Sequence, residues 1–458
     1  MSAIIEKSLT EVAAVAYFRG IDNEGNSVKV ATNNVTDGLN WYGNEWDMSV
    51  QSPDGTRIGN MDLHRLLPIE NMMEGVLLDD NGNEVQKLNS LSWVGQDRSG
   101  VSGQVMVKIP NFYFRFEFDG NKFRFKMLNQ VPEIGKTFPG WNQFFDNSVD
   151  YVYCSAYEAT LDRTNNKLCS VVNIDPQFRG GDNTSSWDGT YRSLLGRPVS
   201  NLSRTSFRNF ARARNTANTF WNEYIYTIHV MLSWLFYSEY NTLNSQKDYN
   251  AQLDINGYKQ GGLGKGVSDI DWNGWSGYNG NNPFVQCGAT DGLGNRSGVV
   301  NCDVLAADGS TVYYTAQVPR YRGIENPFGH LWKWSDGINI KEDGTTRTAY
   351  ITTHTSKYSD SSYDGYENRG VISHAEGWAT RMLLGVFGDL IPTNVGGSSS
   401  TFWCDYYYIN TTPDLFGALL GGNAHDGASD GFGYVSATDV PSDAHANIGS
   451  RLCFVKQA

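Results

Sequence analysis

Closely spaced metal and redox motifs are missing from this 458-residue sequence. Its six cysteines include no C-x-x-C pair, which excludes a zinc ribbon and a thioredoxin-like site. Its seven histidines are His64, His229, His330, His354, His374, His425 and His445. Their wide spacing excludes helix-borne metal pairs such as H-E-x-x-H. We expect most of the cysteines to be small, buried core residues.

Excess positive charge and long apolar runs are also missing. The chain has 36 Lys and Arg against 49 Asp and Glu, and its net charge of −13 would repel phosphates. The longest apolar run, at 224–237, is too short to span a bilayer. The N-terminal stretch 1–20 carries acidic side chains and no uninterrupted apolar run, so we expect no secretory signal. These features predict a protein made in the cytoplasm that binds no nucleic acid and does not insert into membranes.

Aromatic residues and glycine are abundant instead. The chain contains 13 Trp, 25 Tyr and 22 Phe but only 19% charged residues, a composition that argues against disorder. Its 49 Gly and 13 Pro suit many short strands and long loops better than a helical bundle. We predict an α+β fold weighted towards strand and coil.

Local patterns place two elements with particular clarity. Two apolar runs separated by DGNK predict a β-hairpin over 112–128. One face of this hairpin is expected to carry Phe112, Phe114, Phe116 and Phe118. Apolar residues spaced at threes and fours predict a core helix over 218–240. Its buried side chains are expected to include Trp221, Ile228, Leu232 and Leu235.

The same patterns predict three regions along the chain. An N-terminal anchoring and oligomerisation arm is expected at 1–50, with the apolar stretch 14–18 in a subunit interface. A β-rich connecting region follows at 51–140, where turn signals alternate with apolar runs. One domain, with long Gly- and Asn-rich loops from 250 onwards, is expected at 141–458.

Motifs that would indicate an enzyme or a cofactor are weak or incomplete. The GGLGKG stretch at 261–266 lacks the Ser or Thr that follows Lys in a phosphate loop. Asp269, Asp271, Asn273 and Gly274 match the first half of a calcium loop, but Gly280 stands where the bidentate Glu is required. No G-x-S-x-G elbow and no distinct pair of acidic residues can be singled out. We predict no enzymatic activity and no cofactor, with structural calcium as a minor alternative.

Three blocks in the second half of the chain resemble a known fold family. The closing segment 421–455 resembles the end of the C-type lectin-like fold found in formylglycine-generating enzymes and in phage tropism determinants. The matching residues are Gly421, Gly422, Ile448, Gly449, Arg451 and Leu452. The segment 325–340 is similar to the family's Gly-x-hydrophobic-Trp-x-Trp block, and 203–246 looks like its core helix. Segments at 57–82, 105–117 and 157–171 also look like parts of phage tail-fibre and related virion proteins.

The resemblance implies a C-type lectin-like domain at 141–458 in a phage virion protein. The implied function is host-surface receptor binding, to a host glycan or protein, with the N-terminal region contacting other virion proteins. The resemblance to tail-fibre chains, which form trimeric assemblies, also implies a homotrimer. A purely structural fibre, collar or capsid-decoration protein is the main alternative, and a glycan depolymerase is a weaker one. The enzyme branch needs two nearby catalytic cysteines, whereas Cys404 and Cys453 are far apart in the sequence with no other cysteine near either.

The resemblance also indicates where a receptor would bind. In the related tropism determinants the variable receptor-contacting positions lie in this C-terminal segment. If 406–408 form a strand, alternation would bury Tyr407 and expose its two neighbours. We predict that one exposed receptor-binding patch contains Tyr406, Tyr408, His425, Asp426, Phe432 and Tyr434.

Overall fold

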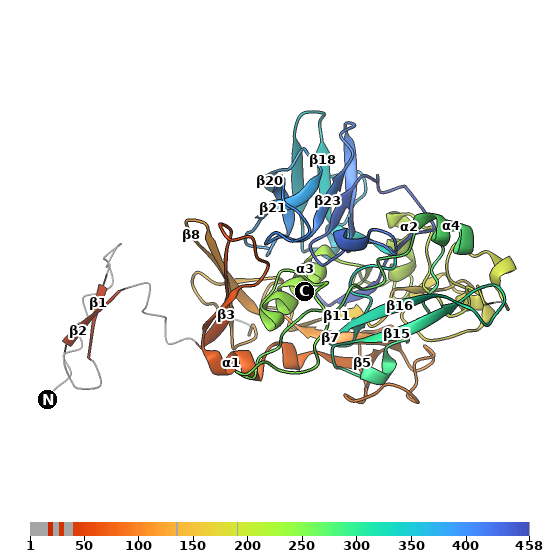
Figure 1. Cartoon of the computed structure of the whole chain (residues 1–458), viewed down its shortest axis with the longest axis horizontal. Coiled ribbons are helices and arrows are strands. Elements are labelled where there is room, and N and C mark those ends of the chain that lie inside the picture. The colour runs from red at the N-terminus through yellow and green to blue at the C-terminus, as the bar shows by residue number, and fades with distance from the viewer. Residues whose placement is uncertain (1–16, 22–26, 32–39, 134–135, 190, 458) are drawn as a thin grey trace. The chain divides into compact units, whose positions relative to one another are not determined.

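The computed structural model describes residues 17–21, 27–31, 40–133, 136–189 and 191–457 (Figure 1). The chain forms two compact units, Met1–Trp41 and Tyr42–Ala458. In the first unit, β1 (Tyr17–Ile21) and β2 (Ser27–Ala31) form an antiparallel pair. The predicted interface stretch 14–18 falls partly outside the described residues, so its role stays a prediction.

The second unit contains two sheets built mainly from the first half of the chain. A five-stranded sheet has the order β10 (Asn142–Gln143), β8 (Tyr113–Asp119), β9 (Lys122–Leu128), β3 (Trp41–Asp47) and β4 (Thr56–Gly59). A six-stranded sheet has the order β14 (Trp221–Glu223), β27 (Leu452–Val455), β11 (Tyr151–Ser155), β7 (Gln104–Pro110), β5 (Glu74–Leu78) and β6 (Glu84–Lys87). The C-terminal strand β27 therefore lies between strands from the first half of the chain.

The largest sheet is built from the second half of the chain. Its strands follow the order β20 (Glu367–Ile372), β19 (Arg347–Ile351), β18 (Trp332–Glu342), β24 (Asp414–Leu420), β25 (Val435–Ala437), β23 (Tyr406–Ile409), β21 (Gly377–Leu383) and β22 (Ile391–Val395), with β26 (Ile448–Gly449) beside β18. The first and last strands of this order also meet, because Ser373 N, directly after β20, donates a 2.9 Å hydrogen bond to Pro392 O in β22. The sheet is consequently a nearly closed barrel.

Smaller strand groups and short helices complete the unit. The remaining strands are β12 (Thr160–Asp162) with β13 (Lys167–Cys169), and β15 (Gly298–Leu305) with β16 (Val312–Tyr321) and β17 (Ile324–Glu325). The α-helices are α1 (Met61–Leu66), α2 (Arg204–Arg212), α3 (Tyr226–Tyr240) and α4 (Trp272–Asn279). Single 3-10 turns are η2 (Glu70–Met72), η3 (Pro176–Phe178), η4 (Ser185–Trp187), η5 (Asp291–Leu293), η6 (Thr355–Lys357) and η7 (Gly427–Ser429).

The predicted α+β fold class is wrong, and the C-type lectin-like domain with long loops stays a prediction. Strands make up 34% of the chain and helices 13%, so the fold is β-rich. The Gly-rich composition beyond residue 250 suggested loops, but strands there are held by distant partners. In β18, Trp334 pairs with Leu419 of β24, a contact between distant segments that no local pattern encodes.

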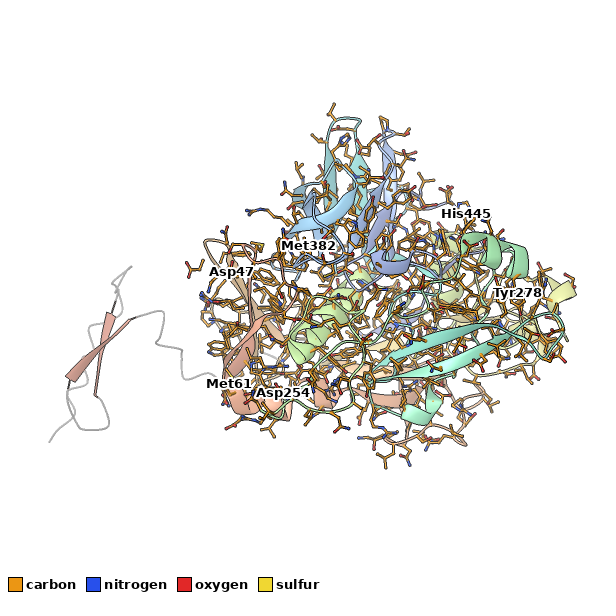
Figure 2. The ribbon with its side chains drawn as sticks, in the orientation of Figure 1. Asp47, Met61, Asp254, Tyr278, Met382 and His445 are labelled. Atoms are coloured by element: carbon orange, nitrogen blue, oxygen red, sulfur yellow. The ribbon has the colours of Figure 1, made fainter. Side chains whose placement is uncertain are left out.

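The helix α3 lies at the centre of the core, beneath β18, β20, β21 and β23 in the view of Figure 1. All of its residues are buried, including the predicted Ile228, Leu232 and Leu235. Trp221 is also buried but lies in β14 rather than in the helix. The helix ends at Asn241, whose φ of 56° gives the left-handed cap typical of a helix C-terminus. Figure 2 shows side chains filling the space around it.

The predicted hairpin is confirmed and packs directly on this helix. Strands β8 and β9 pair from Phe114 opposite Met127 to Asp119 opposite Lys122. Phe125 of β9 stacks on Trp234 of α3 at a centroid distance of 4.6 Å. The hydrophobic core that contains these rings runs from Tyr42 to Val455, so the regions predicted as 51–140 and 141–458 share it. Their predicted boundaries stay predictions.

Most of the cysteines are buried, and the segment that partly matches a calcium loop forms the N-terminal cap of a helix. Five of the six cysteines are buried, as predicted, and Cys302 is half-buried. Asp271 caps α4 by accepting a hydrogen bond from Gly274 N at 3.0 Å. Among the described residues, no three His, Cys, Asp or Glu side chains gather as a metal site would require. The same residues include no helix with the length and apolar character needed to cross a membrane.

The buried carboxyl of Glu70 is expected to make the stability of the protein depend on pH. Burial raises the pKa of Glu70 to about 7, although Tyr42 donates its hydroxyl to this carboxyl at 2.6 Å. The nearby Arg322 forms two hydrogen bonds with Glu239 instead. The folded pKa lies above the ordinary value, so Glu70 reduces stability as pH rises through the interval from 4.5 to about 7.

We expect Glu70→Gln to remove this pH dependence, because the amide resembles the protonated acid. In urea unfolding the variant should match the parent near pH 4.5 and exceed it by about 3 kcal/mol near pH 8. The matched control is Glu376→Gln at an exposed carboxylate, which should leave the pH profile unchanged. A variant that keeps the parent's slope would show that Glu70 is ionised in the folded protein.

Candidate functional site

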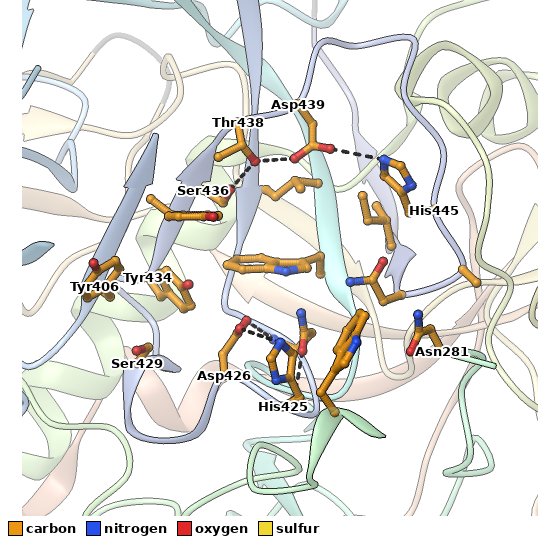
Figure 3. Close-up of a pocket in the computed structure, with 18 residues that line it drawn as sticks. Asn281, Tyr406, His425, Asp426, Ser429, Tyr434, Ser436, Thr438, Asp439 and His445 are labelled. Atoms are coloured by element: carbon orange, nitrogen blue, oxygen red, sulfur yellow. Dashed lines mark hydrogen bonds and ion pairs between the residues drawn. The ribbon is translucent and has the colours of Figure 1, made fainter. Parts of the chain in front are cut away.

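An open pocket of about 600 Å³ lies over the barrel-like sheet, between β23, β25 and β26 and the start of α4 (Figure 3). Five of the six residues predicted for receptor binding line it: Tyr406, Tyr408, His425, Asp426 and Tyr434. They come together because β23 and β25 pair in parallel, with Tyr407 opposite Val435 and Tyr408 opposite Ser436. The two sequence segments are therefore neighbours in space.

The rings of β23 alternate as predicted. Tyr407 is fully buried, Tyr406 is half-buried and Tyr408 is 46% exposed. Pairing on both sides of β23 fixes which face each ring occupies. Tyr406 and Tyr408 consequently face the pocket from the outer side of the strand.

Phe432, the sixth predicted residue, lies in the core and not in the pocket. Its side chain is fully buried and packs on Phe236 of α3 at a centroid distance of 5.3 Å. Its backbone carbonyl accepts a 2.6 Å hydrogen bond from Nε2 of His229, which fixes the loop against the helix. Phe432 therefore anchors the segment that carries the pocket residues and cannot itself touch a ligand.

Two glycines turn the chain out of β24 towards the pocket. Gly421 and Gly422 have φ values of 85° and 82°, in the left-handed region that favours glycine. A Cβ on Gly422 would also lie 1.6 Å from Oδ1 of Asp430, so no side chain fits there. This turn positions His425 and Asp426 at the pocket wall.

Aromatic rings form much of the pocket lining. Trp332 and Tyr434 meet edge to face at 4.6 Å, and Tyr406 lies edge-on to Tyr434 at 6.1 Å. Trp272 of α4 packs against the His425 ring at 4.6 Å and is itself 40% exposed. The accessible rings offer flat apolar faces beside polar atoms.

Two His–Asp pairs lie on opposite sides of the pocket (Figure 3). His425 Nε2 is 3.8 Å from Oδ1 of Asp426, and His445 Nε2 is 3.5 Å from Oδ1 of Asp439. The Thr438 hydroxyl donates to Asp439. Burial raises the pKa of Asp426 to about 7 and lowers the pKa of His425.

The acidic character of the pocket is not balanced by lysine or arginine. Its acidic side chains are Asp426 and Asp439, and no Lys or Arg occurs among the described residues that line it. Among the described lining residues, His425 and His445 are the remaining ionisable side chains besides the tyrosines. The site therefore suits ligands without net negative charge.

A second hollow adjoins the first. It has a volume of about 680 Å³ and shares Tyr408 and Thr438 with the pocket. The rest of its lining is His374, Ala375, Glu376, Ile409, Asn410 and Thr411, from the ends of β23 and the approach to β21. The two hollows thus form one continuous surface, which we call the groove.

Several groove residues were not predicted from the sequence. Trp272, Asp439 and His445 lie far from β23 in the sequence and reach the groove through the packing of α4 and the β25–β26 connection. Trp332 belongs to the block at 325–340 that carried the family resemblance, which was its only signal. Asp439 and His445 lie in the closing segment 421–455, which also carried the resemblance, whereas Trp272 had no such signal.

Comparison with known proteins gives weak likenesses. No protein-family model matches the chain, and no curated protein matches it. Among solved structures, PvdO from Pseudomonas aeruginosa is 11% identical, with a TM-score of 0.31, over 77% of this chain and 95% of its own. The Major Tropism Determinant M1 variant is 10% identical, with a TM-score of 0.26, over 84% and 72%. The U1 variant is 9% identical, with a TM-score of 0.21, over 97% and 96%. At these TM-scores the likenesses assign neither a fold nor a family.

Proposed function

We propose that this chain is a phage virion protein that attaches the particle to the host surface through the groove. The observation that carries the proposal is the gathering of five predicted receptor-binding residues, from separate segments, around one open pocket. Partly exposed rings beside carboxylates and hydroxyls are typical of recognition surfaces. The sequence resemblance to tropism determinants and tail-fibre segments supports the virion assignment.

Adsorption of the labelled full chain to the phage's host bacterium tests this proposal. Tyr408→Ala combined with His425→Ala removes two exposed groove side chains without opening the core. We expect cell binding to fall by at least about tenfold, which corresponds to about 1.4 kcal/mol of binding free energy. Phe118→Ala, at a 61% exposed ring outside the groove lining, is the matched control and should bind normally.

The competing explanations predict different results. Normal adsorption by the folded double variant would favour a structural fibre, collar or capsid-decoration protein, in which this surface has no receptor. Circular dichroism of the variant separates loss of binding from loss of folding.

A depolymerase remains a second candidate because Asp426 and Asp439 both line the pocket. Two carboxyl groups with different environments are what glycoside hydrolysis requires. Release of reducing ends from host polysaccharide, abolished by Asp439→Asn, would support this activity. Binding without release would leave attachment as the function.

For the assembly we propose a homotrimer whose N-terminal region contacts other virion proteins. The support is the sequence resemblance to trimeric tail-fibre chains and the separate compact unit at Met1–Trp41. Light scattering of the full chain should give three times the chain mass of 50.9 kDa. A stable monomer would contradict the proposal.

A further inference from the structure

The groove has features that select a class of receptor. Its two hollows, of about 600 and 680 Å³, meet at Tyr408 and Thr438. Each volume alone is within the range of a small-molecule pocket, so together they exceed what one sugar unit would fill. An elongated ligand would place consecutive units in the two hollows and cross Tyr408 between them.

The lining of the groove disfavours an anionic ligand. Asp426, Asp439 and Glu376 line it, and the described lining residues of both hollows include no Lys or Arg. The whole chain carries a net charge of −13, which adds a repulsive long-range field. A phosphorylated or uronic-acid chain would meet this repulsion with no lysine or arginine among the described lining residues to compensate it.

The chemistry of the lining favours carbohydrate over protein. Tyr408 and Trp272, at 46% and 40% exposure, offer ring faces on which sugar C–H groups can stack. Asn410, Thr411 and Asn281 supply neutral hydrogen-bonding groups. The described lining residues of both hollows include no Met or Arg, two residue types enriched at protein interfaces, and their aliphatic side chains Leu419, Ile448 and Ile409 are buried or half-buried.

From these observations we infer that the receptor is an uncharged or basic glycan chain that lies across both hollows, with Tyr408 stacking at their junction. This inference rests on the proposed attachment function and specifies its ligand.

A competition experiment with the labelled full chain tests the inference. The probe is deproteinised surface polysaccharide of the host bacterium, divided by anion exchange into an unretained fraction and a retained, anionic fraction. We expect the unretained fraction to reduce binding to cells at least tenfold and the retained fraction to have no effect. After partial hydrolysis, fragments of four to six sugars should compete at least tenfold better than single sugars.

Each other outcome has a defined meaning. Competition by the retained fraction alone would contradict the inference that the glycan is uncharged or basic. If single sugars compete as well as the longer fragments, the glycan does not need to lie across both hollows. If neither fraction competes while Tyr408→Ala still abolishes cell binding, the receptor is a protein and attachment through the groove stands. If Tyr408→Ala binds cells as well as Phe118→Ala does, the attachment function itself fails.

Discussion

Replacing Leu232 by alanine is expected to lower the free energy of unfolding by about 2–5 kcal/mol, the range for large-to-small changes in a packed core. Leu232 is fully buried in the middle of α3, and every residue of this helix is buried. Phe236, one turn further along the same helix face, is itself held by ring contacts with Tyr240 and Phe432 at 4.8 and 5.3 Å. The site can therefore collapse only partly around the cavity.

Urea unfolding of the full chain followed by tryptophan fluorescence measures this change. Leu253→Ala, at a 52% exposed leucine, is the matched control and should shift stability by less than about 0.5 kcal/mol. Equal stabilities of the two variants would mean that α3 does not form the centre of the core.

The success of the helix and hairpin predictions has a local cause. The β8–β9 hairpin is defined by a turn sequence between two aromatic runs, and α3 by apolar spacing within one segment. Both signals lie within a few residues of the elements they specify. The predicted core helix is buried all round, because sheets and loops from distant parts of the chain surround it.

The barrel-like sheet could not be predicted in this way. Its order places β25 between β24 and β23, and its closing contact joins Ser373 to Pro392. Composition rich in glycine and asparagine resembles loops until partner strands satisfy the backbone hydrogen bonds. The fold class was therefore predicted wrongly.

For the candidate site, too, a local pattern predicted correctly, whereas burial that depends on distant packing was not predicted. Strand alternation correctly separated Tyr407 from Tyr406 and Tyr408. Phe432 was grouped with exposed residues because it lies in the closing segment to which the resemblance assigned the receptor-contacting positions, but α3 covers its ring. Burial of a loop residue depends on what packs over it, and this information is not in the loop.

A buried ion-pair network joins α2 to the barrel-like sheet. Arg208 of α2 donates from Nε and Nη2 to the two carboxylate oxygens of Asp336 in β18, at 2.7 and 2.5 Å. Asp336 is fully buried, and Arg204, also fully buried, binds Asp360 at 2.6 Å. The network fastens α2 onto the barrel-like sheet that carries the groove.

We expect Asp336→Ala to destabilise the protein by about 3–5 kcal/mol, because it leaves a buried guanidinium short of its main partner. Asp360 alone would then face both arginines. The exposed pair of Lys247 and Asp54 offers a control, since Asp54→Ala should cost no more than about 1 kcal/mol.

A paired replacement separates the cost of an unpaired charge from the value of the pair. Arg208→Met together with Asp336→Leu removes both charges and keeps apolar volume, so it should cost less than Asp336→Ala alone.

The neighbouring Glu223 provides a second test, because burial and, secondarily, the Asp336 charge raise its pKa well above the ordinary value. Removing Asp336 should let Glu223 ionise more readily and partly replace the lost partner, so adding Glu223→Gln to Asp336→Ala should destabilise further. Urea unfolding of the three variants measures these differences, and a double replacement no more stable than Asp336→Ala would show that the pair itself, rather than the unpaired arginine, determines the loss.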